Sequence, residues 1–358
     1  MRLFPARGGA LGLAATPAPP LLFILVGILL GPQMVGVLSR EVLLNLDVVI
    51  SVALAALGIF VGFGLGVVRA NGPSRLLLAA WVEAALTVVV VGGVMYALLS
   101  RWGLPVPADT RLFALVLGVC ACASAATRLV NGSDLDARIA RIVDLGDVPL
   151  VALGTVTVAL AGSRNVPNSL LVGAGATVLA AAGGALLFAR ANSEAERGVY
   201  VTGVVVLLGG LGAYTGVSPL LTGTLAALVW VRGSTGADRI IATDLRALQH
   251  PLVALLLIVA GASIQWTAAL LWITGPLVLL RLIGKLVGGA AAARLARLPA
   301  GQLAGVLVPP GVLGVALALN VQQVLDAPDA LLISAVTVAV GVFELLSLAA
   351  TDEGDERP

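Results

Sequence analysis

The chain is 358 residues long, and 59% of its residues are apolar and 11% are charged, whereas an average soluble domain is about 45–50% apolar and about 25% charged. Its 21 Lys and Arg against 19 Asp and Glu leave a net charge of +2, so nothing indicates a nucleic-acid partner. Two cysteines and one histidine are too few for a disulfide framework, a zinc site or a Ser-His-Asp triad.

This composition predicts a membrane protein without a resident metal, cofactor or enzymatic activity. A membrane helix needs about 20 mostly apolar residues, and twelve stretches meet that need. In chain order they are residues 19–38, 45–68, 76–100, 111–131, 140–162, 168–190, 198–214, 217–232, 248–265, 267–293, 302–322 and 329–351. We therefore predict an all-α polytopic membrane protein with a transporter domain over 19–351, between a short segment (1–18) and a short acidic tail (352–358).

The basic residues fall unevenly on the two sides that twelve crossings define. Fifteen lie on the side of the termini, and four lie on the other: Arg40, Arg101, Arg111 and Arg164. Because cytoplasmic loops carry the excess of Lys and Arg, we expect both termini in the cytoplasm. The expected location is the inner membrane of a bacterium.

A few charged residues fall inside the predicted spans, where each costs about 2.5–3.5 kcal/mol to insert. Away from the span ends they are Glu83, Asp144, Asp147, Arg281, Lys285 and Glu344, whereas we interpret Asp47, close to the extracytoplasmic end of its span, as an interfacial charge. At a rise of 1.5 Å per residue, four of them lie roughly 9 to 14 Å from the cytoplasmic face, so they can share one layer: Glu83, Asp147, Lys285 and Glu344. Charges retained at such depth usually face a cavity or a partner.

These six residues have different expected roles. Lys285 is the only lysine of the chain, and a desolvated lysine can release its proton whereas arginine cannot. Arg281 lies on the same helical face and is either a second partner for the carboxylates or a stabilising pair for Glu83 or Glu344. We expect Asp147 to bind an ion, Asp144 to lie near the membrane boundary, and both glutamates to be structural, paired with Arg281 or a freed backbone amide.

Two spans contain residues that interrupt helices. Pro309, Pro310 and Gly311 unwind the span 302–322 near mid-membrane. The span 111–131 contains small residues with Ser124 and Thr127, whose hydroxyls can satisfy freed backbone groups, although this evidence for a break is weaker. The two spans occupy matching places in two inverted five-helix units, about 19–162 and 217–351, and such matching interruptions indicate a transporter's ion site.

Seven segments in this order resemble the monovalent cation:proton antiporters, the broad family of sodium/hydrogen exchangers and glutathione-gated potassium efflux systems. Gly27, Gly31 and Pro32 form the family's G-x-x-x-G-P pattern, and the sequences DVVISVALAALGIFVGFGL, ASAATRLV, LGDVPLVAL, TGVSPLLTGTLAALV, RLIGKLVGG and GVFELLSLA follow. Asp147 falls on the family's essential carboxylate and Lys285 on its conserved lysine. The chain departs from the family at Gly146, where relatives commonly carry Asp, Asn or Gln, and over Pro310–Val312, which is often acidic.

The resemblance implies the sodium/proton antiporter fold, a homodimer, and exchange of Na⁺ or K⁺ for H⁺. Asp147 would bind either a proton or the cation, with Ser124, Thr127 and freed backbone carbonyls completing the oxygen shell. Lys285 would pair with Asp147 when no cation is bound. Two alternatives remain: another twelve-helix secondary carrier, although its usual long central loop is here only ANSEAERG, and an antiporter fold that no longer transports.

Overall fold

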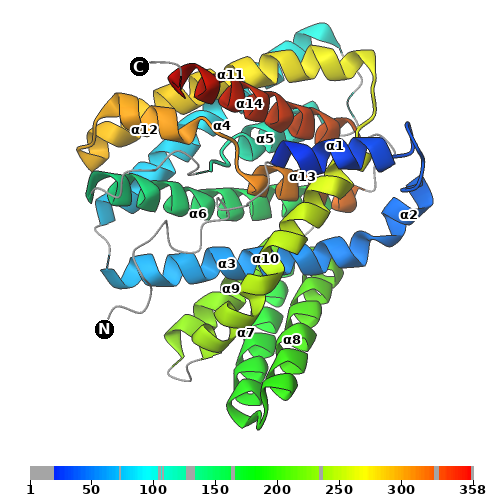
Figure 1. The fold of residues 1–358 in the computed structure, drawn as a ribbon, viewed down its shortest axis with the longest axis vertical. Helices are drawn as coiled ribbons and strands as arrows, with labels where there is room; N and C mark the ends of the chain where they lie inside the picture. Colours follow the sequence, from blue (N-terminus) through cyan, green and yellow to red (C-terminus); the bar gives the residue numbers. More distant parts are fainter. Residues whose placement is uncertain are drawn as a thin grey trace.

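The computed structural model of the protein describes residues 20–71, 74–103, 106, 109–125, 134–162, 166–233, 237–325 and 330–355. Fourteen helices lie within these ranges (Figure 1). In chain order they are α1 (Pro20–Leu30), α2 (Arg40–Asn45), α3 (Asp47–Asn71), α4 (Ser74–Trp102), α5 (Thr110–Cys120), α6 (Asp134–Gly162), α7 (Val166–Arg190), α8 (Glu194–Thr215), α9 (Pro219–Arg232), α10 (Ala237–Ala262), α11 (Ala268–Ala296), α12 (Ala300–Leu307), α13 (Val312–Leu325) and α14 (Leu331–Asp355).

The apolar helices coincide with the twelve predicted spans. Stretches of α3, α4, α6, α7, α8 and α11 are long and apolar enough to cross a membrane. Six further apolar helices of 10–17 residues are described: Pro20–Leu30, Thr110–Cys120, Pro219–Arg232, Leu248–Ala262, Val312–Leu325 and Leu331–Ser347. The predicted class, an all-α polytopic membrane protein, is therefore confirmed.

Some boundaries differ from the prediction. The first span was expected to run to residue 38, but α1 ends at Leu30, because Pro32 disfavours helical geometry in the residue before it. Gly36 then adopts a positive φ of 74° in the turn that leads to α2. At the other end of the chain, α14 continues to Asp355, into the segment expected to be a tail.

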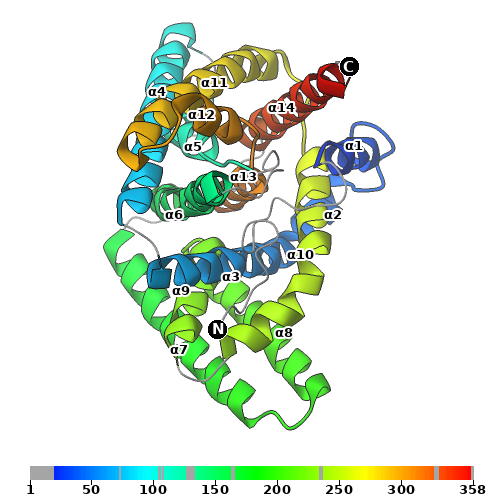
Figure 2. The same ribbon diagram turned by 60° about the vertical axis from the view of Figure 1, so that its left-hand side comes forward.

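The helices form two groups (Figure 2). We call α4, α5, α6 and α11–α14 the core and α1, α3, α9 and α10 the panel. Within the core, α4 packs on α11 and α6 packs on α13. The hairpin of α7 and α8 packs on the panel, where the indole nitrogen of Trp230 donates a hydrogen bond to the carbonyl of Ala181 at 2.8 Å. The core and the panel meet along α3 and α10, which both contact α13.

The panel is held together by two pairs of closely packed helices, α1 with α10 and α3 with α9. In each pair, both helices place a glycine against a backbone carbonyl of the other, so closely that a Cβ atom would overlap the carbonyl oxygen. The contacts are Gly27 with Ile258, Gly261 with Ile24, Gly58 with Leu220, and Gly223 with Ala55. The first helix of each half thus packs on the second helix of the other, as two inverted five-helix repeats require.

Candidate ion-binding site

Two interrupted helices meet in the middle of the core. Helix α5 ends at Cys120, and α12 and α13 are separated by four residues of irregular backbone, Val308 to Gly311. The break expected in the span 302–322 is therefore present, and in the span 111–131 the helix ends at Cys120, while residues 126–131 of that span lie outside the described residues. The proline pair explains the second interruption, because proline removes the amide donor and restricts the residue before it.

Extended backbone from the two interruptions crosses in antiparallel orientation, with Ser124 paired to Pro310. The amide of Ala125 donates to the carbonyl of Pro309 at 3.0 Å, and the amide of Gly311 donates to the carbonyl of Ala123 at 3.3 Å. A Cβ on Gly311 would lie 2.8 Å from the carbonyl oxygen of Ser124. Only glycine therefore fits at this position of the crossing.

The Ser124 hydroxyl belongs to the crossing itself. Its Oγ donates to the carbonyl of Leu307 at 3.0 Å and lies 3.4 Å from the carbonyl of Cys122. It satisfies a carbonyl that the interruption frees, as the sequence indicated. Thr127, the other expected ligand, lies outside the described residues.

Arg281 holds the two interrupted helices together from α11. Its guanidinium donates to the carbonyls of Ala121 and Ala123 on one side and of Val308 on the other, the last two at 2.9 and 3.1 Å. The residue is 4% exposed. The expectation that Arg281 pairs with carboxylates is therefore wrong: its partners are carbonyls at two helix C-termini, where the helix dipole favours a cation.

The ring of Phe343 lies 5.1 Å from the guanidinium carbon of Arg281. It is Phe343 of α14, and not the neighbouring Glu344, that contacts this cation. Glu344 is itself buried. The cation–π contact covers the face of a guanidinium whose edge is occupied by carbonyls.

Lys285 forms an ion pair with Glu83, not with Asp147. Its Nζ lies 2.8 Å from Oε1 of Glu83, and both side chains are almost completely buried. The ammonium also donates to the carbonyl of Cys122. Thr87, one turn after Glu83 in α4, donates to the same carboxylate oxygen at 3.1 Å.

The two cations change the expected oxygen shell of the ion. Arg281 and Lys285 together occupy the carbonyls of Ala121, Cys122, Ala123 and Val308. The sequence-based hypothesis assigned freed carbonyls of both interrupted helices to the transported cation. In this structure those four oxygens accept hydrogen bonds from side-chain cations instead, and a carboxylate lies at the same depth.

That carboxylate belongs to Asp147, which lies in α6 at the depth of the crossing. Gly154 contacts Leu317, so the residues seven positions earlier in the two helices, Asp147 and Pro310, lie at about the same depth. The Asp147 side chain is half-buried. Within the described ranges, its carboxylate has neither a hydrogen-bond donor nor an ion-pair partner.

Lys285 lies beside the same crossing, because its ammonium donates to the carbonyl of Cys122. Asp144 is also half-buried, one turn before Asp147 in α6. Gly146 borders open space, because a Cβ there would meet nothing within 4 Å. The structure therefore brings together Asp147, Asp144, Lys285, Glu83, Arg281 and Ser124 around one crossing. Sequence analysis missed the contributions of Thr87, Cys122 and Phe343, of which only Thr87 gave a signal, its spacing of four from Glu83.

Comparison with solved structures identifies the architecture. Forty-four chains of solved structures match it. One of them is the sodium proton antiporter MjNhaP1 from Methanocaldococcus jannaschii at pH 8, with a TM-score of 0.65. The match has 15% sequence identity and covers 92% of this chain and 93% of that chain. The chain has the sodium/proton antiporter fold. No family profile matches the sequence, and no curated protein matches it. In this antiporter fold, Asp147 lies where two interrupted helices cross.

Proposed function

We propose that this protein exchanges a monovalent cation, Na⁺ or K⁺, for H⁺ across the membrane by secondary active antiport. The observation that carries the proposal is Asp147, a carboxylate without a partner among the described residues, at the crossing of two helix interruptions in an antiporter fold. An unpartnered carboxylate at membrane depth needs either a proton or a bound cation, because an isolated charge there is costly.

Competition for this carboxylate couples the two fluxes. Asp147 binds a proton or a cation, and never both, so release of one accompanies uptake of the other. The four crossing carbonyls are engaged by Arg281 and Lys285. The remaining oxygen ligands of the cation are then water, Asp144 and other backbone carbonyls, with Thr127 as a sequence-based candidate. Gly146 supplies no second ligand, which favours one proton per cation.

The Lys285–Glu83 pair acts as a fixed neutral unit beside the site. Lys285 lies beside the crossing but is paired with Glu83, so binding of the transported cation does not require breaking a direct Asp147–Lys285 ion pair. The ammonium nevertheless opposes a second positive charge at Asp147. This arrangement weakens cation binding and so favours release after transport.

Alternating access comes from movement of the core against the panel. The panel is tied together by helix contacts at backbone distance, whereas the core carries Asp147, the crossing and both internal cations. Rocking or sliding of the core past α3 and α10 exposes Asp147 to one side of the membrane and then the other. The homodimer and the bacterial inner membrane with cytoplasmic termini stay predictions from the sequence.

Cation-induced proton flux in proteoliposomes tests the proposal. Purified protein is reconstituted around a trapped pH dye, and Na⁺, K⁺ or Li⁺ is added outside. We expect an alkaline shift of the lumen when cation enters and protons leave, and we expect Asp147→Asn to abolish it. Asp144→Asn removes a proposed secondary ligand on the same helix, so it should retain the response with an altered dependence on cation concentration.

Two outcomes contradict the proposal. An unchanged pH response of Asp147→Asn places the exchange elsewhere. No response of the wild type to any of the three cations would support the alternative of a fold that has stopped transporting. The five-two-five arrangement of helices already argues against the alternative of a carrier built from two six-helix halves.

A further inference from the structure

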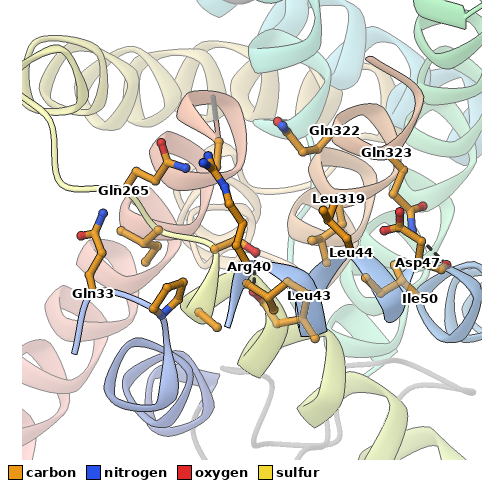
Figure 3. Close-up of a pocket in the computed structure, with 16 residues that line it drawn as sticks. Gln33, Arg40, Leu43, Leu44, Asp47, Ile50, Gln265, Leu319, Gln322 and Gln323 are labelled. Atoms are coloured by element: carbon orange, nitrogen blue, oxygen red, sulfur yellow. Dashed lines mark hydrogen bonds between the residues drawn. The ribbon is translucent and has the colours of Figure 1, made fainter. Parts of the chain in front are cut away.

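A cavity of about 410 Å³ lies between the panel and the core, toward the side predicted to be extracytoplasmic. It is bordered by the segment after α1, by α2, by the start of α3, and by the ends of α10 and α13 (Figure 3). Its polar lining consists of Gln33, Arg40, Asp47, Ser263, Gln265, Gln322 and Gln323. A volume of this size holds a monovalent cation together with its first shell of water, since each water occupies about 30 Å³.

One contact in this cavity joins the panel to the core. Nε2 of Gln323, in α13, donates to the carbonyl of Asp47, in α3, at 3.0 Å and to its Oδ1 at 3.2 Å (Figure 3). The two residues belong to helices that must move relative to each other if the core shifts against the panel. The hydrogen bond therefore stabilises the present relation of the two parts.

An unpaired amide oxygen lies on α13 three residues before Gln323, at a residue that does not line the cavity. Asn320, one turn deeper on α13, is 2% exposed, and its Oδ1 has no hydrogen-bond donor in the described part of the chain. A buried amide oxygen without a donor is costly and calls for a water or a cation. On α3, Ser51 is buried one turn after Asp47. Both helices thus carry a buried polar side chain one turn inward from the Gln323–Asp47 contact, although neither residue lines the cavity itself.

We infer that this cavity is an outer station for the transported monovalent cation, where the ion takes the Asp47 carboxylate and displaces Gln323 from it. This inference rests on the proposed antiport and adds a second site to it. Oxygen ligands suit a hard cation, and the ion offers the carboxylate a stronger interaction than a neutral amide does. Displacement of Gln323 from the carboxylate removes one of its two hydrogen bonds between core and panel, so arrival of the ion loosens this link.

Arg40 keeps the affinity of the station low. It lines the same cavity as Asp47, and Figure 3 shows its side chain extended away from Asp47. Opposite charges in one cavity nearly cancel, so a cation is held by local contact with Asp47 and not by a strong negative potential. Weak binding suits a station from which the ion must leave quickly in either direction.

The station is separate from the site at Asp147. Gly154 of α6 contacts Leu317 of α13, so these two residues lie at the same depth. Asn320 lies three residues beyond Leu317 on α13, and Asp147 lies seven residues before Gly154 on α6. Ten residues at 1.5 Å each therefore separate the depth of Asn320 from that of Asp147 by roughly 15 Å. The α13 residues between them are buried and mainly apolar, among them Val315 and Ala316. An ion at the outer station is therefore not yet at Asp147, and the step between the two requires movement of the core.

Opposite effects of two substitutions test the inference. Antiport is measured in right-side-out and everted membrane vesicles from cells without endogenous antiporters, with the cation added to the outer surface of each. For extracytoplasmic cation, we expect Asp47→Asn to raise the half-maximal concentration about three- to tenfold, the range of a weak ion contact. We expect Gln323→Leu to lower it, because the competing donor is gone. Cation added at the cytoplasmic side should give unchanged values.

Glu41→Gln is the matched control, because Glu41 is an exposed carboxylate in α2 that does not line the cavity. Its half-maximal concentrations should equal those of the wild type on both sides. Shifts of Asp47→Asn and Gln323→Leu in the same direction, or equal shifts on both sides, would indicate general damage and overturn the inference. Wild-type-like values for both variants would also overturn it while leaving antiport intact. A wild type without antiport would overturn both proposals.

Discussion

Replacing Glu83 by glutamine leaves the Lys285 ammonium without its counter-ion while preserving the shape of the side chain. The Nζ–Oε1 distance is 2.8 Å and neither side chain has appreciable exposure, so the attraction is about 6 kcal/mol at an effective dielectric constant of 20. Part of it offsets the cost of removing two charges from water. Breaking one partner of a buried pair typically destabilises a protein by about 3–5 kcal/mol, and we expect that cost for Glu83→Gln.

Thermal unfolding in detergent, followed by intrinsic fluorescence, measures this cost, and the midpoint should fall by about 3–8 °C. Thr87→Val is the matched control, because it removes only the neutral hydroxyl that donates to the same carboxylate at 3.1 Å, a loss of about 1 kcal/mol. Glu83→Gln combined with Lys285→Met should recover much of the lost stability. If Glu83→Gln unfolds no earlier than Thr87→Val, the pair is not a desolvated ion pair and the reasoning fails.

Two further predictions concern packing and the crossing. Gly58→Ala should destabilise the protein, because its Cβ would overlap the carbonyl of Leu220. Gly64→Ala, where the Cβ meets nothing within 4 Å, should be neutral or stabilising by up to about 1 kcal/mol. Equal unfolding midpoints for the two variants in detergent would contradict this expectation. Arg281→Lys should lower the antiport rate severalfold and the free energy of unfolding by about 2–3 kcal/mol, since a lysine cannot reach carbonyls on both interrupted helices. If this variant has the cation flux and the unfolding midpoint of the wild type, the contacts of Arg281 are dispensable.

The helices and one of the two interruptions follow from the sequence because their causes are local. Runs of apolar residues specify membrane helices, and Pro309 and Pro310 remove the donors that would continue a helix. The interruption after Cys120 has no proline, and small residues alone gave weaker evidence for it. Beyond the end of α5 the backbone pairs with the other interrupted segment, Ser124 with Pro310, and this long-range contact cannot be read from the sequence.

The partners of the buried charges do not follow from the sequence. Their positions in the sequence predict similar depths for Glu83, Asp147 and Lys285. Lys285 could therefore form an ion pair with either Glu83 or Asp147. The choice depends on the rotation of α4 and α11 about their axes, which is set by contacts such as Gly288 of α11 against the backbone of Glu83. Arg281 binds carbonyls, which every residue carries, so no side-chain pattern could reveal its role.

In the panel, the first helix of each half packs on the second helix of the other half, and this arrangement has a consequence for biosynthesis. Helix α1 packs on α10, and Gly27 meets Ile258, a residue synthesised roughly 230 positions later. At about 5–20 residues per second, the ribosome needs on the order of 10–50 s to produce that partner. During this interval α1 has only lipid or the insertion machinery against its glycine face. Assembly of the panel must therefore wait for the second half of the chain, so a nascent chain that stops before α10 can insert its helices but cannot complete the fold.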